Sequence, residues 1–202
     1  MKVDHLLFTV PDLDAGIEEA GRLLGVEPTR GGRHPDLGTA NALIGMGPDS
    51  YLEIIGPDPE RDHGTDLTIL GMDFTTPRLG TWVAKAKLTG RLAARLPAVF
   101  GAVRPGQRLT PEGERLSWLF TDPFEPRYGG VVPCLIDWTD TAHPGSTLEP
   151  LCRLVDLRLE HPTPRLVEEA VGEFGGGLSV VRGDRPRVVA EIATPLGVVE
   201  LS

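Results

Sequence analysis

Four polar residues near the start of the chain are of the types that bind metal ions or move protons: His5, Asn41, Tyr51 and Glu53. A neutral imidazole and an ionised carboxylate are ligands for Zn, Fe, Ni or Mn ions. The same two groups would equally make a general acid and base pair. A simpler alternative is that Glu53 only accepts a hydrogen bond from His5 or Arg33 in a wet cleft, where nothing reacts.

Side-chain alternation in strands would bring these four residues to one face. The segment 3–10 is rich in β-formers, and its alternate apolar residues are expected beneath a helix, which puts His5 on the opposite face. The same alternation in 40–46 and 51–55 puts the other three polar residues on that opposite face as well. The sequence therefore predicts one shared polar site.

The elements that position this site recur along the chain. Apolar spacing predicts a helix over 13–24, with Asp12 as its N-cap and Gly25 at its end. A strand, a helix and further strands follow one another in the same order later on. We expect βαβββ units at about 1–56, 81–138 and 152–202, with 57–80 as a connection.

Several motifs together resemble a known family. They are VDHLLFTVPDLDAGIEEAGRLLGV (3–26), GGRHPDLGTANALIGMG (31–47), SYLEIIGPDP (50–59) and PCLIDW with the later HP (133–144). As a set they are similar to the glyoxalase-like domain of the vicinal oxygen chelate superfamily, over most of 1–145. The resemblance implies an α+β fold in which paired βαβββ units form curled mixed sheets, a cup, with the helices on its outer face. It also implies a divalent metal held by the first and last strands of the paired units.

By this resemblance, His5 and Glu53 occupy the two metal-ligand positions of the first unit. The second unit departs from the pattern, because its corresponding positions depend on register and fall at Trp82 or Val83 in the first strand and at Leu135 or Asp137 in the last. The two first-strand candidates cannot bind a metal. Two ligands are therefore expected, with a third unidentified.

The third unit offers another set of acidic residues. Asp156 lies near the position that matches His5, and Glu200 matches Glu53 in the phrase VVEL. Pairing of units one and three, within the chain or across a dimer, would join these four residues. An odd number of units leaves one without a partner, so a homodimer is expected. The segment 152–202 would pack on the first part or pair across that dimer.

Further candidates lie at the expected rim of the cup. Arg33 could grip a substrate carboxylate or phosphate from a loop, and His34 could shuttle a proton or be an exposed loop histidine. Trp138 would stack on a ligand or cap the core. The predicted site thus has Glu53 and His34 as catalytic residues, His5 and Glu53 as metal ligands, and Arg33, Asn41, Tyr51 and Trp138 as substrate contacts.

Composition excludes several other classes. The basic residues are scattered singly and are outnumbered by acidic ones, 20 against 29, so no nucleic-acid partner is expected. The longest apolar runs are far too short for a membrane span. Cys134 and Cys152 lack metal or redox spacing and are expected to be inert thiols, and the first residues lack a signal peptide. The expected location is cytoplasmic.

Two functions remain. The first is a divalent-metal-dependent enzyme acting on a small molecule with vicinal oxygens, as an isomerase, a lyase or a dioxygenase. The alternative is a metal-free protein that binds or sequesters a small molecule in the same cup.

Overall fold

A computed structural model describes residues 2–35, 37–61, 73–90, 98–121, 127–172 and 177–202. Its elements, in chain order, are β1 (Lys2–Thr9), α1 (Leu13–Leu24), β2 (Thr29–His34), β3 (Thr39–Gly47), β4 (Ser50–Pro57), β5 (Arg78–Lys85), η1 (Ala98–Phe100), β6 (Val103–Leu109), β7 (Arg115–Thr121), η2 (Tyr128–Gly130), β8 (Cys134–Asp137), η3 (Pro144–Ser146), β9 (Arg153–His161), α3 (Pro164–Val171), β10 (Leu178–Arg182), β11 (Arg187–Thr194) and β12 (Gly197–Leu201). The η elements are short 3-10 turns.

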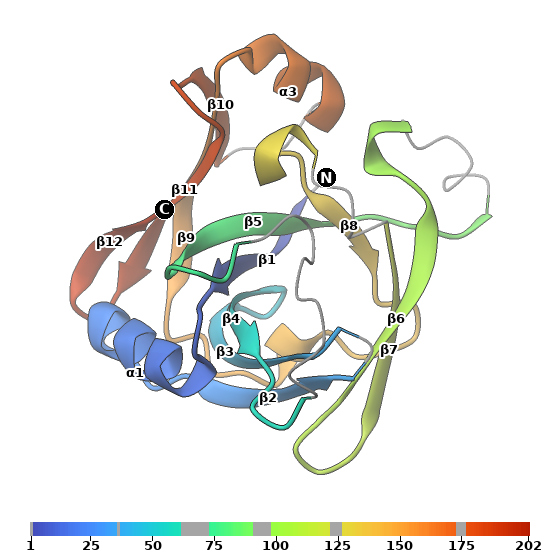
Figure 1. The fold of residues 1–202 in the computed structure, drawn as a ribbon, viewed down its shortest axis with the longest axis vertical. Helices are drawn as coiled ribbons and strands as arrows, with labels where there is room; N and C mark the ends of the chain where they lie inside the picture. The colour runs from blue at the N-terminus through green and yellow to red at the C-terminus, as the bar shows by residue number, and fades with distance from the viewer. Residues whose placement is uncertain (1, 36, 62–72, 91–97, 122–126, 173–176) are drawn as a thin grey trace.

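Eight strands close into a barrel in the order β1-β4-β3-β2-β6-β7-β8-β5 (Figure 1). Within each half of the barrel, the last strand of the unit lies beside the first, so the two halves share one strand order. The halves join where β1 pairs antiparallel with β5 and where β2 pairs with β6. The predicted α+β class with curled mixed sheets is confirmed, and α1 packs on the outside against β3 and β4.

Local sequence explains the clear start and stop of α1. The Asp12 side chain accepts a hydrogen bond from the backbone N of Ala15, and Gly25 adopts the left-handed conformation with φ of 67°. Both caps agree with the sequence-based expectation. The helix expected in the second unit falls largely on residues 91–97, which lie outside the described residues.

The expected loop before β3 is in fact a strand. β2 carries Arg33 and His34, and its glycines allow close packing, because a Cβ on Gly32 would lie 2.0 Å from the carbonyl oxygen of Leu109 on β6. A glycine-rich segment resembles a loop in sequence, but here its glycines let two strands meet at the seam of the barrel.

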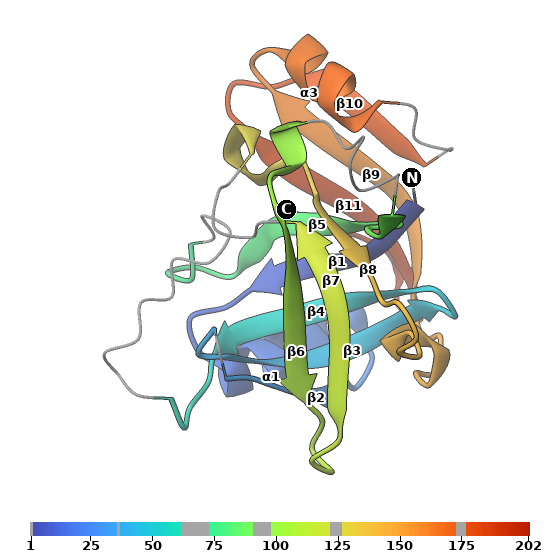
Figure 2. The same ribbon diagram turned by 90° about the vertical axis from the view of Figure 1, so that its right-hand side faces the viewer.

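The last four strands form a separate sheet in the order β10-β9-β11-β12. Here α3 connects the parallel neighbours β9 and β10, and β12 lies at the edge, away from β9. The chain order of elements repeats that of the first unit, but the pairing differs. Figure 2 shows this orange and red sheet standing beside the barrel strands β5 and β1.

The barrel wall separates two apolar clusters. The outer cluster joins the barrel, α1 and the last sheet, and includes Leu6, Trp82 and Leu157. The inner cluster contains Leu7, Ile55, Val83 and Ile136. The alternation expected from the sequence thus holds in β1 and β4, and it leaves the inward positions free to form a cavity. Among the described residues, no helix is long and apolar enough to cross a membrane.

Candidate active site

A cavity of about 210 Å³ lies inside the barrel. It is bordered by residues from both halves: His5, Leu7, His34, Leu37, Asn41, Tyr51, Glu53, Ile55, Val83, Arg104, Pro105, Gly106, Gln107, Arg108, Trp118, Phe120, Cys134, Ile136 and Trp138. The four residues that alternation placed on one face, His5, Asn41, Tyr51 and Glu53, all line it. The size of the cavity suits a small ligand.

One wall is polar and has a fixed orientation. The backbone N of Gly32 donates to Asn41 Oδ1 at 2.8 Å, which leaves the Asn41 amide nitrogen facing Glu53. Asn41 Nδ2 then donates to Glu53 Oε1, also at 2.8 Å. Because the amide oxygen is already engaged, the amide cannot flip without losing both bonds. Glu53 is thereby held with its other oxygen, Oε2, towards His5.

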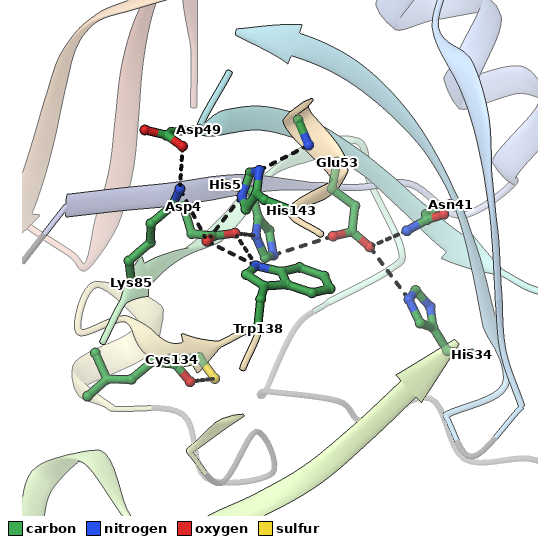
Figure 3. Close-up of polar contacts among 12 residues, drawn as sticks. Asp4, His5, His34, Asn41, Asp49, Glu53, Lys85, Cys134, Trp138 and His143 are labelled. Carbon is green, nitrogen blue, oxygen red and sulfur yellow. Dashed lines mark hydrogen bonds and ion pairs between the residues drawn. The ribbon is translucent and has the colours of Figure 1, made fainter. Parts of the chain in front are cut away.

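His5 lies between two carboxylates (Figure 3). Its Nδ1 is 2.6 Å from Asp4 Oδ1, and its Nε2 is 3.4 Å from Glu53 Oε2. The Tyr51 ring stacks on the imidazole, with centroids 4.6 Å apart and an interplanar angle of 11°. Burial, with the negative charges of Glu53 and Asp4, raises the pKa of Tyr51 well above its usual value, so its hydroxyl stays protonated. These contacts fix the position and the tilt of the His5 ring.

Asp4 is a fully buried carboxylate that simple strand alternation does not place at the polar site. Trp138 Nε1 donates to Asp4 Oδ2 at 3.2 Å, and His143 Nε2 lies 3.2 Å from the same oxygen (Figure 3). Burial alone would raise the pKa of Asp4, but hydrogen bonds and positive charge from His143 and His5 outweigh burial and hold it well below its usual value. Asp4 is therefore ionised, and it directs the Nδ1 proton of His5 towards itself.

A β-bulge explains why simple alternation missed Asp4. The β1–β5 register shifts between Val3 and His5, so Asp4 is the extra residue in its strand. At a bulge, the side chain of the extra residue points in a different direction from the one that regular alternation predicts. The turn after β8 then covers it, because Gly145 N donates to His143 Nδ1 at 3.0 Å and leaves His143 Nε2 facing Asp4.

His34 lies inside the barrel on β2 and is buried. Its Nδ1 is 3.1 Å from Thr39 Oγ1, and its Nε2 is 4.0 Å from Glu53 Oε1. Burial lowers the pKa of His34, against the opposing charge of Glu53, so its ring is neutral near pH 7. The expectation of an exposed loop histidine is wrong for this residue, since it faces the cavity from a strand.

The opposite wall is aromatic. The rings of Trp118 and Trp138 lie 5.2 Å apart, and Phe120 is 6.4 Å from Trp118. Trp118 packs directly on Gly106 of β6, where a Cβ would lie 2.4 Å from the indole nitrogen. The cavity thus presents polar groups on one side and flat apolar surfaces on the other.

The guanidinium groups are arranged differently from the expectation. Arg33 does not border the cavity: its Nε donates to Asp58 Oδ2 at 2.6 Å, and its Nη1 donates to Glu60 Oε2 at 2.5 Å. Arg108, on the inward side of β6, lines the cavity instead. The alternation of β6 could have identified Arg108, because it falls two residues after the inward-facing Gly106.

The second half of the barrel supplies few candidate metal ligands. Val83 is the register partner of His5, while Cys134 and Ile136 border the cavity from β8. The predicted last-strand positions, Leu135 and Asp137, do not border it. Asp137 instead accepts hydrogen bonds from the backbone N of Leu88 and of Thr139 and from Lys87, which lower its pKa against the effect of burial.

The acidic residues of the last sheet do not join the site either. Asp156 pairs in register with Glu191 on β11, and Glu200 is half exposed with Arg158 Nη2 at 3.3 Å. Because β12 is not a neighbour of β9, Glu200 does not take the place that Glu53 has beside β1. Within one chain, the suggested set of His5, Glu53, Asp156 and Glu200 therefore does not come together, and its assembly across a dimer stays a prediction.

These positions test the metal centre that the resemblance implies. His5 and Glu53 are close enough to share an ion, but the facing strands β5 and β8 present Val83 and Ile136 where ligands would be needed. Within the described part of the chain, no group of His, Cys, Asp or Glu side chains forms a three-ligand set. The residues do not fit a metal centre shared between the two halves.

Comparison with known families decides the relationship. The family model of the glyoxalase-like domain matches residues 3–174. The chain belongs to the glyoxalase-like domain family. The resemblance predicted from the sequence motifs is confirmed, and the match extends past residue 145 through β9 and α3. No curated protein sequence matches the chain.

Two solved structures are similar to this glyoxalase-like protein, and one of them shares its fold. A hypothetical protein from Staphylococcus aureus aligns with a TM-score of 0.65 and 13% identity, over 94% of this chain and 90% of that chain. Methylmalonyl-CoA epimerase from Mycobacterium tuberculosis aligns with a TM-score of 0.44 and 21% identity, over 67% of this chain and 86% of that chain. The second likeness is too distant to bear on the site, and the first shows the fold alone.

Proposed function

We propose that the barrel cavity is the active site of a metal-independent enzyme that moves a proton on a small carbonyl compound. The observation that carries this proposal is the buried pair of His5 Nε2 and Glu53 Oε2, 3.4 Å apart at the cavity wall. Both groups are held by other residues, His5 by Asp4 and Glu53 by Asn41. Of the isomerase, lyase and dioxygenase outcomes expected from the family, this arrangement favours the isomerase.

The proton count of the pair supports acid–base chemistry. Because His5 Nδ1 donates its proton to the ionised Asp4, a neutral His5 would turn a lone pair on Nε2 towards a carboxylate oxygen. Two acceptors facing each other in a buried site are unfavourable. One proton held between Nε2 and Oε2 removes that repulsion. The separation is longer than a tight hydrogen bond, so the pair is open to a ligand, as catalytic contacts in free enzymes often are.

The proposed reaction uses that proton. The Glu53 carboxylate takes a proton from a carbon beside a ligand carbonyl, and the electrons of the broken C–H bond form an enolate. His5 gives its Nε2 proton to the enolate, at oxygen or at carbon, and the product is a tautomer or a stereoisomer. The proton now on Glu53 returns to His5 and restores the pair. Asn41 stabilises the Glu53 carboxylate, and the neutral His34 donates or accepts at the cavity wall.

Deuterium exchange tests the proposal. Wild-type protein in D2O is expected to speed the exchange of carbon-bound protons in 2-oxobutyrate or 4-phenyl-2-oxobutyrate, followed by proton NMR. Glu53→Gln removes the base and is expected to lose at least about a hundredfold of the rate. Arg33→Gln, outside the cavity, is the matched control and keeps it. Ligand binding without exchange above buffer on either compound contradicts the enzyme and favours a protein that sequesters its ligand.

Metal analysis addresses the competing proposal that His5 and Glu53 hold a divalent ion. Protein purified without chelator or affinity tag is expected to carry far less than one metal per chain and to keep its exchange rate in EDTA. Near-stoichiometric metal that disappears in the His5→Ala, Glu53→Ala double variant would restore metal dependence.

A further inference from the structure

Arg108 is a buried cation that has no ion-pair partner among the residues that the structure describes. The residue is 6% exposed, and its Nη1 atom has no hydrogen-bond acceptor among the described residues. No ion pair to Arg108 occurs in the described ranges, whereas Arg33 on the neighbouring strand has two. A buried charge left unpaired destabilises a fold, so a position of this kind calls for an explanation.

The location of Arg108 supplies that explanation. The Arg108 Nη1 atom lies 2.9 Å from the point where a Cβ on Gly32 would sit, so the missing side chain of that glycine makes room for it. Gly32 also donates its backbone N–H to Asn41, which holds Glu53. Arg108 is thus beside the polar wall, on the same cavity as the proposed acid–base pair.

We propose that Arg108 binds the carboxylate of a small monocarboxylic ligand whose apolar body lies on Trp118 and Trp138. The reaction of this ligand rests on the proposed function, but its binding does not. A guanidinium group matches a carboxylate in shape and supplies two parallel donors. The two indoles, 5.2 Å apart, offer the flat apolar surface for the rest of the ligand.

The charges of the groups that line the cavity favour a carboxylate over a phosphate as the ligand head group. Arg108 supplies one positive charge to the cavity, whereas the His5–Glu53 pair, which holds one proton between its two members, adds no net charge. His34, which also lines the cavity, stays neutral because burial lowers its pKa. A single negative charge is therefore balanced by Arg108, whereas the second charge of a dianion would have no cation to balance it among these groups. Arg104 also borders the cavity, but it lies at the exposed start of β6.

Binding of three matched probes tests the proposal. Phenylacetate, phenylacetamide and phenylphosphonate share a ring and differ in the head group, and quenching of tryptophan fluorescence reports their binding. We expect wild-type protein to bind phenylacetate at least about tenfold more tightly than the other two, as a charge-assisted hydrogen bond implies. Arg108→Met is expected to remove that preference. Arg115→Met, an exposed charge on the adjacent strand β7, is the control and retains it.

Thermal stability distinguishes a ligand-binding role of Arg108 from a structural role. Without a ligand, Arg108→Met is expected to have a Tm equal to or above that of wild type, because the change removes an unpaired buried charge. A lower Tm, equal affinity for the acid and the amide, tighter binding of the phosphonate, or binding of none of the three overturns the proposal.

The two proposals fail in different ways. Phenylacetate binding that depends on Arg108, without deuterium exchange on any ketone, leaves the ligand class standing and removes the enzyme. Deuterium exchange that depends on Glu53, without any preference for the carboxylate probe, leaves the enzyme standing and removes the ligand class.

Discussion

At the residue scale, the site is organised around one imidazole between two carboxylates. Asp4 and Glu53 lie on opposite ring nitrogens of His5, and each carboxylate is held by a further donor, Trp138 and Asn41 respectively. The result is a ring with a fixed tautomer whose second nitrogen faces the cavity. Positioning groups behind a reactive ring are what distinguish a working site from a chance cluster.

Replacing Asp4 by Asn tests this arrangement. The variant keeps the shape but removes the charge that His5 and His143 face, so we expect a loss of about 3 kcal/mol in the free energy of unfolding. Deuterium exchange should fall as well, because the His5 tautomer is no longer fixed. Asp49→Asn is the matched control, since the Asp49 side chain is 75% exposed. Urea unfolding measures the stability of both variants. Equal free energies of unfolding for Asp4→Asn and Asp49→Asn would contradict the buried role of Asp4.

His34 predicts a pH dependence of stability. Because burial lowers its folded-state pKa, the unfolded chain binds a proton at His34 below its ordinary pKa, about 6.5, before the folded chain does. Stability therefore falls as pH drops from 7 to 5, with a slope of at most about 1.4 kcal/mol per pH unit from this group. His34→Gln should flatten that slope in urea unfolding, and His161→Gln, on β9, should leave it. The same slope in wild type and His34→Gln contradicts the assignment.

The sequence predicted some of these residues and missed others for a definable reason. Alternation correctly brought His5 and Glu53 together, because β1 and β4 are regular where they pair. Asp4 was missed because the bulge that re-aims it depends on pairing with β5, a partner more than 70 residues away. His34 was assigned to a loop because glycines before it serve packing at the seam, which a single sequence does not reveal.

At the element scale, the β6–β7 hairpin sets the shape of the aromatic wall. Gly106 lies opposite Trp118 in the register, and its missing side chain lets the indole lie flat over the strand. The hairpin therefore contributes both the wall that would cover a ligand and the inward-facing Arg108.

Gly106→Ala tests this contact. Its Cβ would lie 2.4 Å from the Trp118 indole nitrogen, so the ring must move into the cavity. We expect a loss of about 1–3 kcal/mol in stability, as for other overpacked positions, and weaker binding of phenylacetate. Gly113→Ala in the turn of the same hairpin is the control. No atom lies within 4 Å of its added Cβ, but its φ is +83°, so it is expected to reduce stability without changing binding. Unchanged binding by Gly106→Ala would show that Trp118 does not border the ligand.

At the scale of the whole molecule, the order of elements was predictable and the pairing of the last sheet was not. The order of elements along the chain follows from local sequence patterns. Whether β11 or β12 pairs with β9 depends instead on contacts across the fold. The last sheet buries an apolar face against the barrel, so its lack of a partner unit does not by itself require a second chain. The homodimer stays a prediction, and light scattering at micromolar concentration checks it.

The shared outer core predicts that barrel and last sheet unfold together. Leu157 of β9 is fully buried in the same cluster as Trp82 and Leu135 of the barrel. Leu157→Ala should therefore lower the free energy of unfolding by about 2–5 kcal/mol. Val198→Ala on β12, where the side chain is 64% exposed, should change it by less than about 0.5 kcal/mol.

Tryptophan fluorescence makes this prediction decisive, because all three tryptophans, Trp82, Trp118 and Trp138, belong to the barrel and its following turn. In Leu157→Ala the fluorescence transition and the far-UV circular dichroism transition should shift together to lower urea. A fluorescence midpoint equal to that of wild type, with an earlier partial loss of circular dichroism, would mean that the last sheet unfolds independently. The barrel, and the cavity within it, would then stand without the sheet, and substitutions in residues 153–201 would leave phenylacetate binding unchanged.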